Sequence, residues 1–160
     1  NAGLGRAASL EAVTEADLDE QFEVNVKGLF FTVQKAVPLI ARGGSIVLTT
    51  SFLNTKGTPG LSILSATKAA VRSLARTLGA ELAPRGIRIN AICPGVIETE
   101  LGNSLTRSRG EEMKKGIMLG RLGKPADVPT GHTTKSGPAV ANPTPEAPQQ
   151  PAEPTDEVTE

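Results

Sequence analysis

One stretch of the chain, residues 51–68 (SFLNTKGTPGLSILSATK), constrains the fold more than any other. An apolar, β-branched run from Ile46 to Thr50 precedes it, and a helical pattern follows it as far as Leu82. The stretch places a serine at the end of a predicted strand, then a loop with glycine and proline, then a lysine inside a helix. Open α/β sheets carry active sites in this arrangement, so the stretch predicts both a fold class and a site.

The first third of the chain is predicted to form a long helix. Thr14 and Asp17 have the spacing of a capping box, so a helix should begin near Glu15. Apolar residues then recur at helical intervals as far as Ala41, through one long helix or two abutting ones. This apolar stripe consists of Leu18, Phe22, Val26, Leu29, Phe30, Val33, Val37 and Ile40.

A strand, a helix and a second strand are predicted next. Residues 45–50 form a continuous apolar run, which predicts a strand buried on both faces. The apolar spacing of residues 62–83 indicates a helix of about five turns. Pro84 and Gly86 should end this helix, and Ile87 to Cys93 should form the next strand. This order of elements predicts parallel pairing of the two strands.

Beyond Gly95 the pattern becomes irregular. Residues 95–123 are expected to form a mobile loop over a substrate, with helical character from Glu111 to Met118. Seven of the chain's 12 prolines lie in residues 129–160, where no large apolar residue occurs. A segment of this composition buries too little apolar surface to offset the conformational entropy that it would lose on folding. We therefore expect one partial domain over residues 1–128 and a disordered tail rich in Pro, Thr and Glu over residues 129–160.

Several short motifs resemble those of the short-chain dehydrogenase/reductase (SDR) family, and they occur in the same order. Ser51 and Lys68 match the active-site serine and lysine of the family, and Asn25, in the sequence NVKG, matches its active-site asparagine. Three further matches are residues 1–3 (NAG, the end of the family's N-N-A-G motif), residues 94–99 (PGVIET, a P-G-x-I-x-T turn) and residues 121–125 (RLGKP). The resemblance extends from Asn1 to about Val128.

The resemblance implies an NAD- or NADP-dependent oxidoreductase that acts on a small alcohol or carbonyl compound. The catalytic residues would be Ser51, which would hydrogen-bond the substrate oxygen, Lys68, and Asn25, which would hold a water linking Lys68 to solvent. Residues near the cofactor would be Asn1, Ala2 and Gly3 at the adenosine ribose, Lys68 at the nicotinamide ribose, and Pro94, Gly95, Ile97 and Thr99 at the carboxamide. No metal is implied.

One departure from the family pattern bears directly on catalysis. The family's proton donor is a tyrosine four residues before the lysine, on the same helix face, and this position holds Leu64. The chain contains no tyrosine at all. The family's Gly-rich phosphate turn would also lie ahead of Asn1. We therefore expect oxidoreductase activity and cofactor binding to be weak or absent in the chain as written.

Composition excludes several other classes of protein. The formal net charge is +0, which gives no reason to expect nucleic acid as a partner. No apolar run reaches the roughly 18 residues that a membrane helix needs, and no signal peptide is evident. A single cysteine, Cys93, excludes an intrachain disulfide and favours a reducing compartment, so we expect a cytoplasmic protein. Cys93 itself, at a strand end, is expected to lie in the core.

The sequence thus predicts an α/β fold, namely the second half of a Rossmann-like, doubly wound parallel sheet with three αβα layers, incomplete and followed by a disordered tail. In the SDR family the two long helices pack against a second subunit, which implies a homo-oligomer here. Two alternatives to a weak oxidoreductase remain open. The chain could be a non-catalytic interaction module that pairs with a full-length relative, or a truncated or shifted reading frame without selected function.

Overall fold

The computed structural model describes residues 3–100, 102 and 114–128. A long helical stretch comes first: the α-helix α1 (Glu15–Phe22), a π-helical segment (Glu23–Gly28), the α-helix α2 (Leu29–Ala36) and a 3₁₀ turn (Val37–Leu39). The strand β1 (Ser45–Thr49), the helix α3 (Ser62–Leu82) and the strand β2 (Arg88–Ile92) follow. Short 3₁₀ turns cover Phe52–Asn54, Ala83–Arg85 and Pro125–Asp127.

The predicted start of the first helix is confirmed, whereas the helical stretch ends at Leu39, two residues before the predicted Ala41. The Thr14 hydroxyl accepts the amide of Asp17, and the Asp17 carboxylate accepts the amide of Thr14, which completes the capping box at the start of α1. Helix α3 ends at Leu82, one residue before the predicted end. Gly86 then adopts a left-handed conformation with φ of 69°, which glycine tolerates without strain and which turns the chain into β2.

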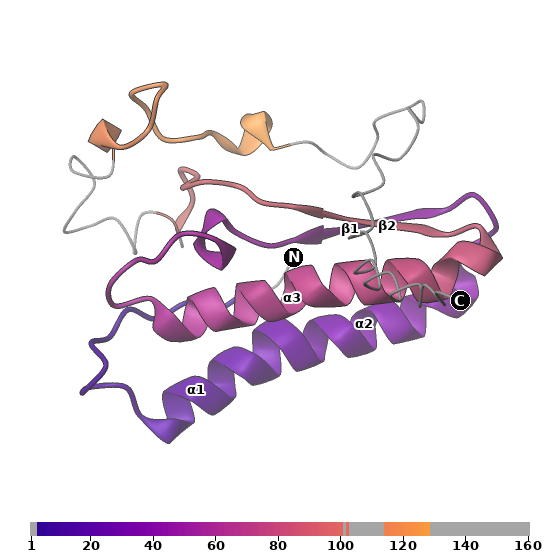
Figure 1. Cartoon of the computed structure of the whole chain (residues 1–160), viewed down its shortest axis with the longest axis horizontal. Coiled ribbons are helices and arrows are strands. Elements are labelled where there is room, and N and C mark those ends of the chain that lie inside the picture. Colours follow the sequence, from indigo (N-terminus) through magenta and orange to yellow (C-terminus); the bar gives the residue numbers. More distant parts are fainter. Residues whose placement is uncertain (1–2, 101, 103–113, 129–160) are drawn as a thin grey trace, which may run out of the picture.

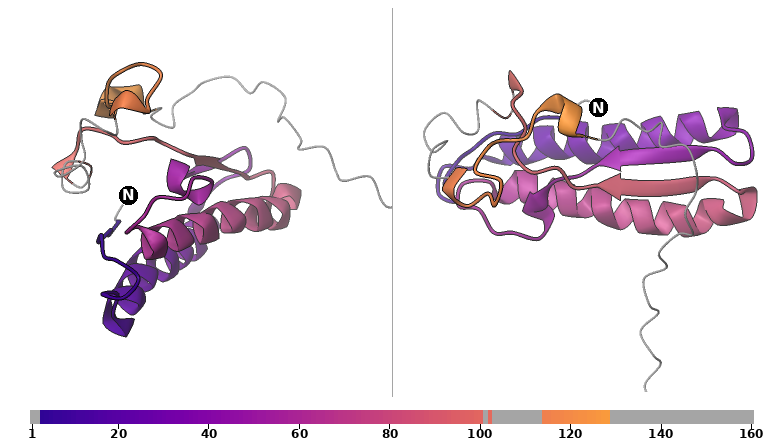
Figure 2. Two further views of the ribbon diagram at one scale, coloured as in Figure 1. Left: turned by 60° about the vertical axis from the view of Figure 1, so that its left-hand side comes forward. Right: turned by 90° about the horizontal axis from the view of Figure 1, so that it is seen from above.

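The two strands pair in parallel, as predicted. The register runs from Ser45 opposite Arg88 to Thr49 opposite Ile92. The helical stretch from α1 to α2 and the helix α3 lie side by side on one face of this sheet, and residues 114–128 pass on its other side (Figures 1 and 2). The described residues therefore have an α/β architecture with two parallel strands and two long helical stretches. Helices on both faces, as a three-layer fold requires, are not seen in this part of the chain.

A single apolar core lies between the helices and the sheet. Val71 of α3 is completely buried and Ile87, just before β2, is 2% exposed. Burial of one such side chain contributes about 1.5–3 kcal/mol. The other buried members of this core are Val33, Val37, Leu48, Ala75 and Leu82.

The prediction that the first strand is buried on both faces is wrong. Leu48 is buried, but Ser45 is exposed and Val47 is 37% exposed. Side chains alternate between the two faces of a strand, and in the described residues the helices pack on one face only. A continuous apolar run does not reveal which of its faces will be covered. The predicted tail, and residues 111–113 of the predicted helical region, lie outside the described residues.

Candidate functional site

A large cavity lies where β1 and β2 end. Its volume is about 1270 Å³, and it is bordered by the π-helical segment, the loop that follows β1, the start of α3 and the turn after β2. The described residues that the sequence predicts for the site all line this one cavity: Gly3, Asn25, Ser51, Lys68, Pro94, Gly95, Ile97 and Thr99. Asn1 and Ala2 lie outside the described residues. Segments far apart in sequence therefore meet at the carboxyl ends of parallel strands, where open α/β sheets bind ligands.

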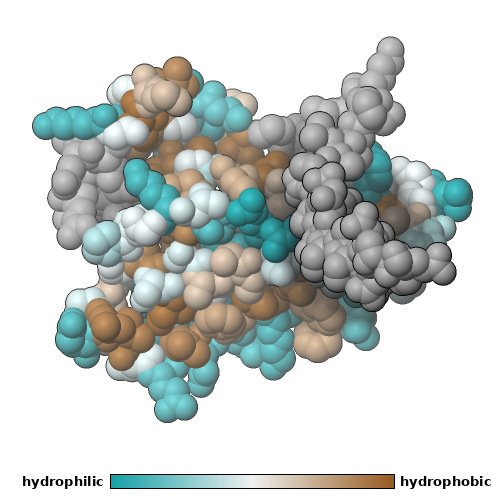
Figure 3. Space-filling model, viewed as in Figure 1, coloured by the Kyte–Doolittle hydropathy of each residue, from teal (hydrophilic) through white to brown (hydrophobic). Residues whose placement is uncertain are grey.

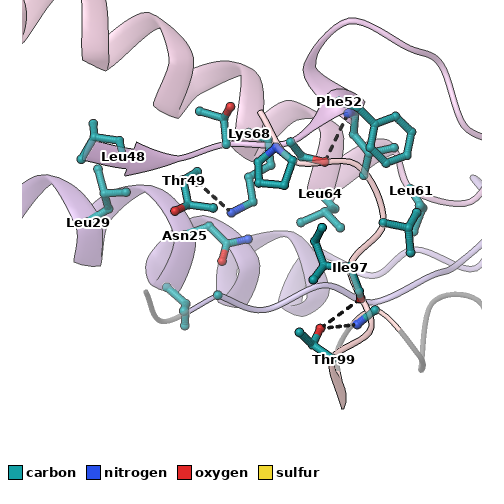
Figure 4. A pocket seen from close by; sticks show the side chains of 18 of the residues that line it. Asn25, Leu29, Leu48, Thr49, Phe52, Leu61, Leu64, Lys68, Ile97 and Thr99 are labelled. Atoms are coloured by element: carbon teal, nitrogen blue, oxygen red, sulfur yellow. Dashed lines mark hydrogen bonds between the residues drawn. The ribbon is translucent and has the colours of Figure 1, made fainter. Parts of the chain in front are cut away.

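Lys68 extends from α3 into this cavity (Figure 4). Its Nζ donates a hydrogen bond of 3.3 Å to the backbone carbonyl of Thr49, at the end of β1. The side chain is half-buried, and this burial lowers the pKa of the Lys68 amine because it disfavours the charged form. Lys68 is the one ionisable side chain among the described residues that line the cavity.

Asn25 lies in the π-helical segment and is 3% exposed. Its Oδ1 accepts the amide of Leu4 at 2.8 Å, and its Nδ2 donates to the carbonyl of Leu4 at 2.7 Å and to the Thr67 hydroxyl at 3.2 Å. The amide thus ties Leu4 to Thr67 of α3. A methyl group placed on Gly3 would lie 3.8 Å from Asn25 Oδ1 and 4.0 Å from Lys68 Nζ, so these three residues are close neighbours.

Ser51 is the N-cap of the 3₁₀ turn that follows β1. Its hydroxyl accepts the amide of Leu53 at 3.2 Å, and the residue is half-buried at the edge of the cavity. A cap of this kind leaves the serine proton and a second lone pair for another partner. The hydroxyl therefore caps the 3₁₀ turn and also lines the cavity.

Leu64 lies one helical turn before Lys68 and also lines the cavity. It is 5% exposed and packs in a small apolar cluster with Leu53, Leu61 and Phe52. A methyl group placed on Gly5 would come within 2.8 Å of Leu64 Cδ2, so a glycine at this position makes room for the leucine. The wall of the cavity beside the lysine is consequently apolar.

The turn after β2 is held on two sides. The Phe52 amide donates to the Pro94 carbonyl at 3.1 Å, which joins this turn to the loop after β1. On the other side, Ile97 and Gly123 form a parallel β-bridge, and the Glu98 amide donates to the Gly123 carbonyl at 2.7 Å. The Thr99 hydroxyl accepts the amide of Gly102 at 3.1 Å. The motif at residues 121–125 thus serves to position the turn at residues 94–99.

Sequence reasoning missed two groups of polar residues. Thr67 is completely buried, and its hydroxyl joins Asn25 to the Leu64 carbonyl. Cys93 was expected in the core but is exposed, because its thiol points to a polar cluster with Thr50 at 2.9 Å and Asn54 at 3.4 Å. The available signal for the first group was the position of Thr67 directly before the site lysine. For the second group it was the position of Thr50 at the end of the strand that neighbours the one leading to Cys93.

Metal binding and membrane spanning find no support in the part of the chain that is described. No group of three or more His, Cys, Asp or Glu residues there could hold a metal ion. None of the helices described is both long and apolar enough to cross a membrane.

Comparisons with known proteins place this fold and site in a family. A family model described as enoyl-(acyl carrier protein) reductase matches residues 1–131. The oxidoreductase asL5 of Sarocladium schorii is 43% identical over 131 residues, which are 80% of this chain and 53% of that protein. The 3-oxoacyl-[acyl-carrier-protein] reductase FabG of Thermotoga maritima is 42% identical over 130 residues, with the same coverage of both chains.

Solved structures agree with the sequence matches. A short-chain dehydrogenase from Burkholderia cenocepacia, in complex with NADP, has a TM-score of 0.74 and 32% identity over 79% of this chain and 52% of its own. A 3-ketoacyl-(acyl-carrier-protein) reductase from Brucella melitensis, complexed with NADH, has a TM-score of 0.72 and 31% identity over 79% and 53%. The chain belongs to the short-chain dehydrogenase/reductase family and corresponds to its C-terminal portion. It spans about half the length of the relatives it matches.

Proposed function

We propose that this chain forms the nicotinamide side of an NAD(P)-dependent oxidoreductase for small alcohols or carbonyl compounds, and that Leu64 keeps its turnover low. The observation that supports the proposal is the convergence of Asn25, Ser51, Lys68 and the 94–99 turn on one cavity. Its relatives, which include ketoacyl reductases and proteins in complex with NADP and NADH, point to the same chemistry.

The residues of the cavity fit the nicotinamide end of such a cofactor. The backbone at Gly3 lies close to both Asn25 and Lys68, since a Cβ on Gly3 would be in van der Waals contact with both side chains. Lys68 would donate hydrogen bonds to ribose hydroxyls, since its amine has three donors and one described acceptor. Ile97 and Thr99 would contact the carboxamide from the opposite wall. A bound nicotinamide would supply or accept the hydride.

Proton transfer is the step that this chain lacks. Ser51 would hydrogen-bond the substrate oxygen, but Leu64 offers no proton in the position where the family has a phenol. A positioned acid or base contributes about 10²–10⁴ in rate. Binding of nucleotide and substrate could therefore survive in a site whose turnover is reduced by that factor.

The proposal is tested by titration of NADH and NADPH against the purified chain by calorimetry, together with Leu64→Tyr. Leu64→Phe is the matched control, because it adds nearly the same ring volume without the hydroxyl. We expect saturable but weak binding in all three proteins. Turnover of a generic ketone should rise about 10²–10⁴-fold in Leu64→Tyr and stay unchanged in Leu64→Phe.

Two results would contradict the proposal in different ways. Absence of nucleotide binding in all three folded proteins would remove the cofactor role of the cavity. Turnover by the unaltered chain equal to that of Leu64→Tyr would show that the phenol is not what the site lacks.

A second function, a non-catalytic module that pairs with a full-length relative, is favoured by apolar side chains exposed on the helices. Leu18 is 44% exposed, Phe31 47% and Leu39 86%. Apolar residues are spread over the helices in the lower half of Figure 3. Sedimentation of this chain mixed with a full-length relative tests this function. A new heterodimer would support it, and two unchanged separate species would exclude it for that relative.

A further inference from the structure

The surroundings of Lys68 are unusual for a lysine at the edge of a protein core. None of the described residues that line the cavity is an aspartate or a glutamate, and Lys68 takes part in none of the ion pairs among the described residues. Its one described partner is the neutral carbonyl of Thr49. The side-chain oxygen of Asn25, another residue that lines the cavity, accepts the Leu4 amide. Nothing described in the cavity therefore favours the charged amine over the neutral one by ion pairing.

Burial of the Lys68 side chain also favours the neutral amine over the charged one. It lowers the pKa of the Lys68 amine, so that more of the amine is uncharged near neutral pH than in a solvent-exposed lysine. An uncharged lysine amine in an apolar pocket is a nucleophile toward carbonyl carbon. The leucine at position 64 strengthens this character, since it lines the cavity one helical turn from Lys68 and, among the described lining residues, no carboxylate or phenol is present.

We propose that Lys68 is a covalent capture site for small apolar aldehydes and methyl ketones, which it binds as an imine. The carbonyl compound is specified by the cavity, whose lining includes the apolar cluster of Leu64, Leu61 and Phe52 and, among the described residues, a single charge, that of the lysine. An apolar chain on the carbonyl compound would pack on these side chains, whereas the carbonyl group would face Nζ. This capture needs no nucleotide, so it stands or falls independently of the proposed oxidoreductase function.

The reaction balances without any group from outside. The nitrogen lone pair of the neutral amine attacks the carbonyl carbon, and the carbonyl π electrons move to oxygen. The oxygen takes a proton while the nitrogen loses one, which gives a carbinolamine. Loss of the hydroxyl group and of the remaining N–H proton as water then leaves the C=N bond. No oxidation or reduction occurs in these steps, and the Ser51 hydroxyl lines the same cavity as a possible partner for the oxygen.

The test uses butanal as the probe and sodium borohydride to reduce any imine to a stable secondary amine. The folded chain is treated for a series of short times, and peptide mass spectrometry measures the butyl adduct at each lysine. Lys35 of α2, which is exposed, is the internal control. The same reaction in urea measures the reactivity of each lysine without the fold, and Lys68→Arg keeps the positive charge but removes the primary amine.

We expect Lys68 to be labelled several-fold faster than Lys35 in the folded chain, with this preference lost in urea. Lys68→Arg should lose the fast adduct while labelling at Lys35 stays unchanged. If Lys68→Arg does not fold, the relative labelling rates of Lys68 and Lys35 in the native and the urea-treated wild type still test the proposal. Labelling of Lys68 no faster than Lys35 in the folded chain, or an equal preference in urea, would overturn the proposal.

Discussion

At the scale of single residues, Cys93 shows how local hydrogen bonds change a side chain's chemistry. A hydrogen bond to the Thr50 hydroxyl lowers the pKa of the exposed Cys93 thiol, and the Asn54 amide acts in the same direction. Both groups can donate to a thiolate and so stabilise the charged form. The Thr50 hydroxyl has a single proton, which it can donate either to the Ile92 carbonyl, 2.8 Å away, or to a Cys93 thiolate, and the charged thiolate favours the second arrangement.

We expect Thr50→Val to raise the pKa of Cys93 and to slow its alkylation near neutral pH. The valine has a similar shape but no hydroxyl to donate to the thiolate. Rates of reaction with iodoacetamide, measured against pH, give the pKa directly. Thr55→Val, which removes an exposed hydroxyl bonded to the Phe52 carbonyl, is the control. Equal profiles for all three proteins would mean that Thr50 does not tune the thiol.

Asp127 provides a second prediction at this scale. Its carboxylate accepts Arg121 Nη1 at 2.7 Å and the Lys124 amide at 2.8 Å, and these contacts lower its pKa from 3.8 to about 2. The ion pair therefore stabilises the folded turn above about pH 4, and this contribution is lost as the pH falls through about 2. We expect Arg121→Gln to move the carboxyl titration of Asp127, followed by NMR, toward the ordinary aspartate range. An unchanged titration would contradict the role of Arg121.

At the scale of elements, the sequence predicts the capping and ending of helices and the parallel pairing of β1 and β2, but not the side-chain contacts between distant residues. The capping box of Thr14 and Asp17, and the end of α3 at Pro84 and Gly86, depend on residues close in sequence, so the sequence alone predicts them. The π-helical segment at residues 23–28 was not predicted, because the Asn25 amide bonds to Leu4 and Thr67, which lie 21 and 42 residues away. The exposure of Val47 and Cys93 was missed for the same reason.

The same contrast between local sequence patterns and long-range contacts applies to the site. The positions of Ser51 and Lys68 around a cavity follow from a strand–loop–helix pattern that is visible in the sequence. The contacts that hold them were not visible: the Thr49 carbonyl on Lys68, the cap made by Ser51 and the bridge from Gly123 to Ile97. Each of these contacts depends on how the chain packs in three dimensions. The roles assigned to the site residues remain predictions.

Asn25 allows a prediction about how elements are joined. Asn25→Ala would remove three hydrogen bonds and leave the amide and carbonyl of Leu4 without their described side-chain partner. We expect a loss of about 1–3 kcal/mol in the free energy of unfolding, measured with urea. Hydrogen exchange at the Leu4 amide should also accelerate. The control is Asn90→Ala, at an exposed position in β2. A loss no larger than that of the control would show that the amide is not a structural tie.

At the scale of the whole molecule, the described residues form a one-sided layer. In this part of the chain β1 and β2 pair only with each other, and the helices cover only one face of the sheet. Helix α2 carries the exposed Phe31, whose ring stands edge-on to Phe30 with centroids 5.6 Å apart. Exposed apolar side chains of this size on a helix are a common feature of association surfaces.

We therefore expect the chain to self-associate through its long helices, and Phe31→Lys to weaken this association. A lysine there would have to be desolvated in the interface, and a symmetric dimer would bring two equal charges near each other. Sedimentation velocity over a range of concentrations measures the change. Leu10→Lys is the matched control, because Leu10 is 82% exposed but lies in the turn ahead of α1. A shift toward monomer in Phe31→Lys alone would assign the interface to the helices. An equal shift in both variants would indicate non-specific apolar association, and no shift in either would place any interface elsewhere.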